Sequence, residues 1–252
     1  MSTRNVRKIR PAARDFADTV SVASDLLCSQ NSERELEKRF GIQKAILVPT
    51  SADSNTLTQN IAHAAGVVIS KPLKPSMAVG VGWGRTLQLS VNSIQRKPSG
   101  HISVVSLLGG LTRGSAMNSY EIASRLVDIF RADCFYIIAP AFTHTEKTAK
   151  LFRSQSSVRD AFEHARKVDI AFLSVGSLHP TSTMSRLGLV NKDDVKSLRV
   201  AGAVGDFCTQ WIDVKGNIVD HPLNRRVITL PVDQLQHIPL VILASGGEKK
   251  CR

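Results

Sequence analysis

The chain has 252 residues, 42% of them hydrophobic, so it can bury the core of one large α/β domain or of two small ones. Its formal net charge of +12 is compatible with non-specific attraction to nucleic acid, but only 5% of the residues are aromatic, which argues against a single-strand binder that stacks bases. No apolar run reaches the length of a membrane helix and the four cysteines form no C-x-x-C pair, so we expect a reduced, cytoplasmic protein without a membrane span.

Residues 1–30 are expected to form a basic tail or a linker helix ahead of a single domain over 31–252. A helix over 14–27 would place Phe16, Val20 and Leu27 on one face. The tail carries part of the positive charge, and a solvated arm is favoured over a DNA-binding one. Its cations are Arg4, Arg7, Lys8, Arg10 and Arg14.

Strand and helix patterns alternate from residue 32 to residue 175. A capping box at Ser32 and Glu35 predicts a helix that ends at Phe40, before Gly41. The pattern then predicts strands over 45–48, 101–108, 134–139 and 168–175, with helices over 57–68, 120–131 and, as one or two elements, 145–166. Such alternation indicates an α/β fold with a mostly parallel sheet covered by helices on both faces.

After Gly205 the pattern becomes β-rich. An apolar segment over 207–214 leads into Lys215, Gly216 and Asn217, which is typical of a strand followed by a tight turn. We expect 227–230 to be its partner strand and 239–244 to return to the core. The fold is therefore expected to carry a small β-rich late segment.

The most informative stretch is A-V-G-V-G-W-G-R-T-L-Q-L-S-V, over 78–91. A short apolar run is followed by glycines at alternate positions, Gly80, Gly82 and Gly84, and then by a helical pattern, which predicts a strand, a tight turn and a helix. Glycines let a ligand approach the main chain, and the free N–H groups of a helix start favour an anion. The turn is a candidate phosphate cradle; the alternative is a turn that only packs strand against helix.

The charges around this turn favour an anionic ligand. No Asp or Glu occurs from residue 54 to residue 120, while the same interval contains Lys71, Lys74, Arg85, Arg96, Lys97 and Arg113. A dinucleotide is disfavoured because the spacing is G-x-G-x-G and the ribose-binding acid about 20 residues further on is missing. A P-loop is excluded because no G-x-x-x-x-G-K-[ST] occurs.

Motifs of catalytic type are scarce. The chain has neither H-E-x-x-H nor G-x-S-x-G. His179 and His221 each precede a proline and are interpreted as turn or surface residues rather than metal ligands. Asp206, in A-G-A-V-G-D-F, either accepts hydrogen bonds from sugar hydroxyls or caps local backbone, and the sequence leaves both open.

Eight stretches resemble the sugar-binding domain of the SorC-type transcriptional regulators, the bacterial family that includes the deoxyribonucleoside and central glycolytic gene repressors. They occur in one order between Glu33 and Lys250, which makes the resemblance far more specific than the glycine turn alone. The stretches are V-G-V-G-W-G-R-T-L (79–87), L-L-G-G (107–110), A-M-N-S-Y-E-I-A-S-R-L (116–126), A-P-A (139–141), V-G-S-L (175–178), A-G-A-V-G-D-F-C (201–208), D-H-P-L-N-R-R-V-I (220–228) and A-S-G-G-E-K-K (244–250).

The resemblance implies a Rossmann-like effector domain, related in fold to sugar-phosphate isomerases, that binds a phosphorylated sugar and transmits its presence to DNA. Family members act as oligomers, commonly tetramers, so a homo-oligomer is expected. No cofactor, metal or catalytic residue is implied. The implied phosphate-binding residues are Gly82, Trp83, Gly84, Arg85 and Thr86, and the implied sugar-lining residues are Gly109, Gly110, Asn118, Gly176, Asp206 and, near the end of the sequence, Lys250.

The sequence departs from this family in two places. Thirty residues ahead of the capping box are too few for the family's helix-turn-helix domain, so specific DNA binding is expected only if such a domain is supplied elsewhere. The family also continues beyond the late Gly-Gly into another helix and strand, whereas this sequence stops at Arg252. Lys250 would then lack the helix that positions it.

Two functions remain open on the sequence. The favoured one is a non-catalytic effector-binding module of a sugar-responsive regulator. The alternative is a sugar-phosphate isomerase or deaminase, because one fold hosts many functions. Proton abstraction next to a carbonyl needs a carboxylate or a histidine in the pocket, and Asp206 is the one late candidate.

Overall fold

The computed structural model describes residues 18–24, 29–95, 101–112 and 115–247. Its centre is a sheet with the strand order β2-β1-β9-β6-β3-β4-β5, in which all neighbours run parallel. A short antiparallel pair, β7 and β8, extends from β6. The strands are β1 Asp18–Ser24, β2 Lys44–Pro49, β3 Ala78–Val81, β4 Ser103–Ser106, β5 Asp133–Phe135, β6 Ile170–Ser177, β7 Gly205–Phe207, β8 Gln210–Ile212 and β9 Leu240–Ala244.

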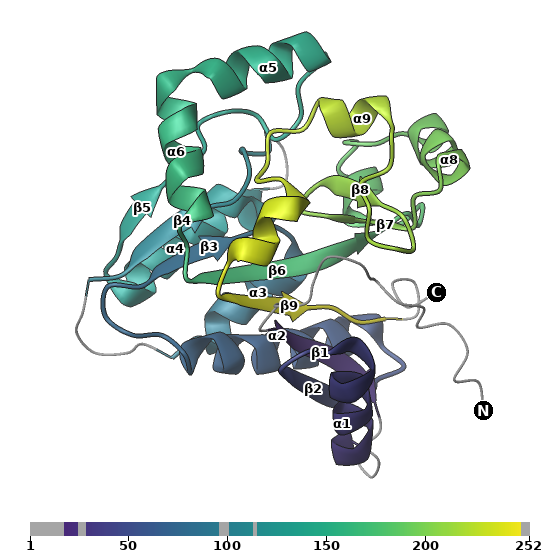
Figure 1. Ribbon diagram of the computed structural model, residues 1–252. Coiled ribbons are helices and arrows are strands. Elements are labelled where there is room, and N and C mark those ends of the chain that lie inside the picture. The colour runs from purple at the N-terminus through teal and green to yellow at the C-terminus, as the bar shows by residue number, and fades with distance from the viewer. Residues whose placement is uncertain (1–17, 25–28, 96–100, 113–114, 248–252) are drawn as a thin grey trace.

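Helices cover both faces of this sheet (Figure 1). The first face packs on α2 Ser54–Ser70, α3 Arg85–Ser90 and α4 Ser119–Phe130, and the second on α5 Glu146–Ser154, α6 Ser156–Arg166 and the 3-10 helix η4 Val232–His237. Successive side chains of β6 pack on opposite faces of the sheet. Phe172 belongs to the buried cluster of the first face and Leu173 to that of the second, and both are fully buried. These features confirm the expected fold class.

A third cluster of buried side chains lies beyond the carboxyl ends of the strands. Most of its members come from residues 178–226, which we call the cap unit. This unit includes β7, β8, α7 Thr183–Arg186, α8 Lys192–Val200 and α9 Pro222–Arg225. Figure 1 shows β7, β8, α8 and α9 together at the end toward which β6 runs. Trp83 and Leu108, which follow β3 and β4, belong to the same cluster. The cap unit therefore packs on the carboxyl edge of the sheet.

The N-terminal prediction is corrected by β1. Where the sequence left a basic tail or a helix over 14–27 open, Asp18–Ser24 forms a strand that pairs with β2 and β9; the rest of 14–27 lies outside the described residues. Short apolar runs do not distinguish the two structures, and the β-branched Thr19, Val20 and Val22 favour a strand. The first helix, α1 Ser29–Phe40, begins before the expected capping box, whereas its end at Gly41, with φ +65°, is as predicted.

The late segment also differs from expectation. Only β7 and β8 form there, joined by a turn at Cys208 and Thr209, and the predicted tight turn at Gly216 follows β8. The segment 227–230 is not their partner: Val227 forms an isolated bridge to Phe142, and Thr229 one to Leu108. Its backbone partners lie more than 80 residues away in the sequence, and no local pattern reveals such a pairing.

The remaining elements follow the predicted order with small shifts in their bounds. Segment 145–166 forms two helices, and the last strand matches 239–244 to within one residue. Beyond the end of β5 at Phe135, the Ile137 N–H donates to the side-chain Oγ of Ser106 in β4 (2.9 Å) and not to a backbone carbonyl of that strand. Within the described residues, no helix combines the length and apolar character needed to cross a bilayer.

Candidate functional site

The glycine turn lies at the point where the sheet changes direction. From β3 the chain proceeds to β4 and β5 on one side, and it then returns to β6 on the other side of β3. Ligands of open α/β sheets bind in the crevice outside the carboxyl ends of strands at such a switch point. The turn after β3 and the end of β6 therefore define the candidate ligand site.

Three hydrogen bonds hold the glycine turn in place. The N–H of Gly82 donates to the Phe172 carbonyl (3.0 Å), the N–H of Gly84 donates to the Met117 carbonyl (3.0 Å), and Ser174 Oγ donates to the Trp83 carbonyl (3.1 Å). The N–H groups of both glycines are thus already engaged. An anion would be held by the N–H groups in the first turn of α3, which begins at Arg85 and whose donors have no partner one turn earlier.

Gly84 is required by its backbone conformation. It precedes α3 with φ +118° and ψ 166°, a combination that side-chain-bearing residues rarely adopt. A Cβ atom there would also lie 3.2 Å from Ser174 Oγ. The turn can therefore take its shape only with glycine at this position.

Asp53, which lies outside the acid-free interval, adds a negative charge near the glycine turn. Asp53 caps α2 and accepts hydrogen bonds from the Asn55 N–H (3.2 Å) and the Thr56 N–H (2.9 Å). Its pKa is lowered, first by the hydrogen bonds from Thr56 and Asn55 and further by the positive charge of Arg85. The acid-free interval begins one residue after Asp53, so the half-buried Arg85 has a carboxylate in its field despite that interval.

Gly109 and Gly110 allow close packing of the segment after β4. A Cβ on Gly109 would lie 2.4 Å from the Ala139 carbonyl oxygen, and one on Gly110 would lie 2.6 Å from the Tyr120 ring. The Asn118 side chain accepts from the Tyr120 N–H (3.3 Å) at the start of α4 and donates to the Leu111 carbonyl (2.9 Å). Structural requirements thus account for all three residues, and their contact with a sugar remains a prediction.

Asp206 and Gly176 face one another across β6 and β7. They are register partners, and a Cβ on Gly176 would lie 1.7 Å from Asp206 Oδ1, so the carboxylate occupies the space that glycine leaves open. Asp206 is 2% exposed. Burial, and secondarily the charge of Asp206, raises the pKa of the Cys208 thiol. The structure brings Asp206 to the end of the strand beside the glycine turn, whereas Lys250 lies outside the described residues.

Both singled-out histidines lie in turns. His179 Nδ1 accepts from the Thr181 N–H (3.2 Å), and His221 Nδ1 accepts from the Leu223 N–H (3.2 Å) at the start of α9. His221 Nε2 lies 3.0 Å from Ser197 Oγ in α8. The described part of the chain contains no group of three or more His, Cys, Asp or Glu arranged to hold a metal ion.

His221 is expected to make folding sensitive to mild acid. Burial, as the largest cause, lowers its pKa from the ordinary 6.5, and protonated Nδ1 would no longer accept from Leu223. A depressed pKa in the folded state means that stability is complete above the unfolded pKa and declines as the pH falls through the folded pKa. We expect urea unfolding midpoints to fall between about pH 7 and pH 5, and His221→Asn, which keeps an N-cap acceptor, to flatten this decline. An equal decline in both proteins would contradict the assignment.

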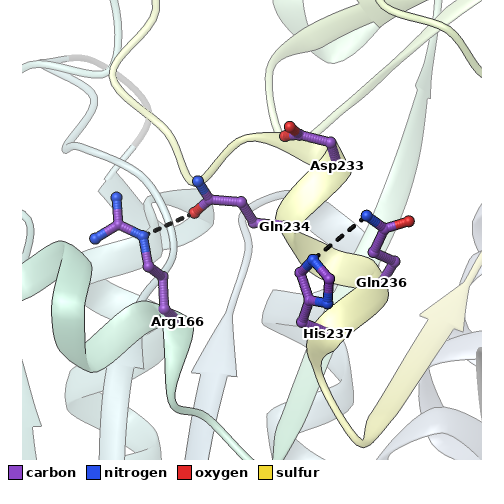
Figure 2. A pocket seen from close by; sticks show the side chains of 5 residues that line it. All are labelled: Arg166, Asp233, Gln234, Gln236 and His237. Carbon is purple, nitrogen blue, oxygen red and sulfur yellow. Dashed lines mark hydrogen bonds between the residues drawn. The ribbon is translucent and has the colours of Figure 1, made fainter.

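A separate hollow of about 370 Å³ lies between α6 and η4 (Figure 2). Both helices lead into the amino ends of strands, β6 and β9, so the hollow is at the opposite edge of the sheet from the glycine turn. Arg166 in it is already engaged, because Nε donates to Gln234 Oε1 (3.0 Å) and Nη1 pairs with Glu163 (2.6 Å). Among the residues that the structure describes, no sequence-predicted site residue lines it; the lining residues are Arg166, Asp233, Gln234, Gln236 and His237.

Sequence reasoning missed three residues of the site. Ser174 and Met117 fix the backbone of the glycine turn, and Asp53 affects the charge around Arg85. Ser174 lies 91 positions from the carbonyl that it contacts. The sequence contains no signal that pairs Ser174 with the glycine turn. A correct placement of β6 beside β3 would have brought Ser174 to the carboxyl edge of the sheet, where the turn lies.

The fold and the turn at its switch point define an α/β ligand-binding domain. A family model described as a sugar-binding domain, Sugar-bind, matches residues 25–252. The chain therefore belongs to this family, the sugar-binding domain of SorC/DeoR-type transcriptional regulators, as the resemblance implied.

Among curated relatives, the deoxyribonucleoside regulator of Bacillus subtilis is 26% identical over 218 residues, which cover 85% of this chain and 69% of the relative. The erythritol catabolism regulatory protein EryD of Brucella abortus is 22% identical over 250 residues, covering 98% and 79%. A solved DeoR family transcriptional regulator from Listeria monocytogenes superposes with a TM-score of 0.82 at 26% identity, covering 88% and 89%. The full-length sorbitol operon regulator SorC from Klebsiella pneumoniae, at 14% identity and a TM-score of 0.77, covers 86% and 78% and shares the fold.

Proposed function

We propose that this sugar-binding domain takes a phosphorylated sugar, with the phosphate at the start of α3 and the sugar toward the end of β6. The observation that carries the proposal is the glycine turn at the switch point, where the N–H groups of Arg85 and Thr86 begin a helix beside the Arg85 side chain. Two relatives are named for deoxyribonucleosides and erythritol, which supports a polyol or sugar effector.

Within the proposed site, the residues divide by chemistry. Backbone N–H groups at Arg85 and Thr86 and the Arg85 guanidinium bind the phosphate, because charge-assisted hydrogen bonds to phosphate are short and strong. Asp206 accepts hydrogen bonds from sugar hydroxyls. Gly82, Trp83 and Gly84 supply the shape of the turn, and Gly109, Gly110, Asn118 and Gly176 line the sugar. Lys250, which lies outside the described residues, is the further ligand that the resemblance implies.

The module acts in the cytoplasm as a homo-oligomer and responds to its effector without turning it over. Its positive charge gives DNA a weak, salt-sensitive attraction through counterion release. Specific recognition of an operator requires a helix-turn-helix domain supplied elsewhere, because base-edge contacts need an element that enters a groove.

A thermal-shift experiment tests the proposed ligand. At a concentration about 100 times its dissociation constant, a sugar phosphate should raise the melting temperature by roughly 5–10 °C, and the matching free sugar should not. Ribose 5-phosphate with ribose and glucose 6-phosphate with glucose are suitable pairs. Equal stabilisation by the free sugar would overturn the phosphate assignment.

The variant Gly84→Val tests whether the ligand binds at the turn. The substitution forces a β-branched residue to positive φ and adds a side chain beside Ser174, so the ligand-dependent shift should disappear. Gly188→Val is the matched control, because Gly188 also has positive φ (+70°) but nothing lies within 4 Å of its Cβ position. The control should keep the ligand-dependent shift even though both variants melt earlier than the parent chain.

Assays with Asp206→Asn separate binding from catalysis. We expect no isomerisation or deamination of pentose or hexose phosphates by the parent chain, and a roughly 10-fold or greater loss of sugar-phosphate affinity in the variant, because hydrogen bonds to a charged acceptor are worth about 1.5–3 kcal/mol. Product analysis by NMR and calorimetric titration supply the two readouts. Turnover that the variant abolishes would establish the enzyme alternative instead.

A further inference from the structure

Trp83 connects the candidate ligand site to the cap unit. It stands between Gly82 and Gly84 in the glycine turn, but its side chain is only 8% exposed. The indole belongs to the buried cluster that also contains Leu198 of α8 and Trp211 of β8. The backbone of Trp83 therefore belongs to the ligand turn, and its side chain belongs to the core of another unit.

The backbone and the side chain of Trp83 are held by different parts of the fold. Ser174 Oγ donates to the Trp83 carbonyl from β6 (3.1 Å), and the N–H of the next residue, Gly84, is held by Met117. The side chain belongs to the cap cluster, to which the segment after β4 also contributes Leu108 and Leu111. A displacement of the cap core is thus passed to the turn, because close-packed interiors transmit strain.

Two features of the cap unit indicate that a different packing arrangement would cost little free energy. The β7–β8 turn places Cys208 at φ +49° and Thr209 at φ +66°, although two-residue turns of this kind favour Asn-Gly and a β-branched residue rarely adopts positive φ. Trp211 is fully buried, yet its indole N–H has no acceptor within the residues that the structure describes. Both features give the observed packing a cost that another arrangement of the cap unit would relieve.

We propose that Trp83 is a positioning residue for the ligand site and that, through it, effector occupancy and the packing of the cap unit control one another. The inference rests on the proposed function and adds how the site is regulated. A ligand that fixes the turn stabilises one arrangement of the Trp83 side chain in the cap core. By thermodynamic reciprocity, a loosened cap core must weaken binding at the turn.

Matched cavity variants test the binding side of this coupling. Leu198→Ala empties part of the cap core, and Leu235→Ala empties part of the core beneath η4; the two leucines are 0% and 1% exposed. With ribose 5-phosphate, glucose 6-phosphate and inorganic phosphate as probes, Leu198→Ala should raise the dissociation constant roughly five-fold or more, whereas Leu235→Ala should leave it within about two-fold. Equal effects of the two substitutions would overturn the proposal.

Tryptophan fluorescence tests the structural side. The chain has two tryptophans, Trp83 and Trp211, and both belong to the cap cluster. In Trp83→Phe, which retains an aromatic anchor, Trp211 is the sole reporter, and a bound sugar phosphate should shift its emission. In Trp83→Ala, binding should weaken by about the same factor as in Leu198→Ala, because the anchor is lost.

The outcomes distinguish this inference from the proposed function. If a probe raises the melting temperature of the parent chain and of Trp83→Phe while Trp211 emission stays constant, the coupling is refuted and sugar-phosphate binding stands. If none of the probes raises the melting temperature of the parent chain, the proposed function fails and the inference fails with it.

Discussion

Replacing Trp211 by alanine is expected to lower the free energy of unfolding by about 3–5 kcal/mol, the cost of emptying a buried aromatic site. The side chain is 0% exposed in the cap cluster, and its backbone is clamped by Asn224, which accepts from the Trp211 N–H (2.8 Å) and donates to its carbonyl (3.0 Å). Because the clamp restrains the backbone of β8, we expect the cavity to collapse only in part. Urea denaturation measures the change.

Two further substitutions test whether the loss of stability comes from removing the buried indole. Trp211→Phe removes less volume and should cost clearly less than alanine, whereas Val214→Ala, at a 55% exposed position on the same unit, should change stability by no more than about 0.5 kcal/mol. A loss below about 1 kcal/mol for Trp211→Ala would show that the cap unit contributes little to the cooperative fold.

The second large effect is expected at Gly109. An alanine Cβ would lie 2.4 Å from the Ala139 carbonyl oxygen, 2.8 Å from the Pro140 carbonyl carbon and 2.9 Å from the Ala141 nitrogen. All three atoms are backbone, so no flexible side chain can move aside, and Gly109→Ala should cost about 1–3 kcal/mol or more through overpacking. The melting temperature should fall by roughly 2–12 °C for a chain of this size.

Gly202→Ala is the control for the glycine substitution itself. Gly202 has φ +88° and nothing within 4 Å of its Cβ position, so alanine there meets conformational strain but no neighbour. The expected cost is about 1–2 kcal/mol. If Gly109→Ala proves harmless, the 107–110 segment must adjust its backbone, and its contact with 139–141 would not constrain the wall of the ligand site.

Local patterns were sufficient to predict the central α/β alternation. Strands such as β2 and β6 are continuous apolar runs, and helices such as α4 combine a clear period with an N-cap residue, Asn118. Strand β1 was missed because only its pairing with other strands identifies it as a strand. Its partner β2 follows 20 residues later, but its other partner, β9, lies more than 200 residues away. Only the tertiary fold places this short segment between them.

The candidate site was predictable in part. Gly82 and Gly84 predicted a tight turn before a helix, and the structure has that turn at the switch point of the sheet. The sequence did not show that the two glycine N–H groups are already engaged, nor that the Trp83 side chain is buried in the cap unit. Both facts depend on segments that are adjacent only in the folded chain.

The central claim, that a sugar phosphate binds at the start of α3, is tested most directly by following backbone amides during a titration. In ¹⁵N-resolved NMR spectra, ribose 5-phosphate or glucose 6-phosphate should move the amide signals of Arg85 and Thr86 most, because their N–H groups bind the phosphate. The amides of Gln234 and His237, at the opposite edge of the sheet, should stay in place. Large shifts at Gln234 and His237 with unchanged signals at Arg85 and Thr86 would contradict the account.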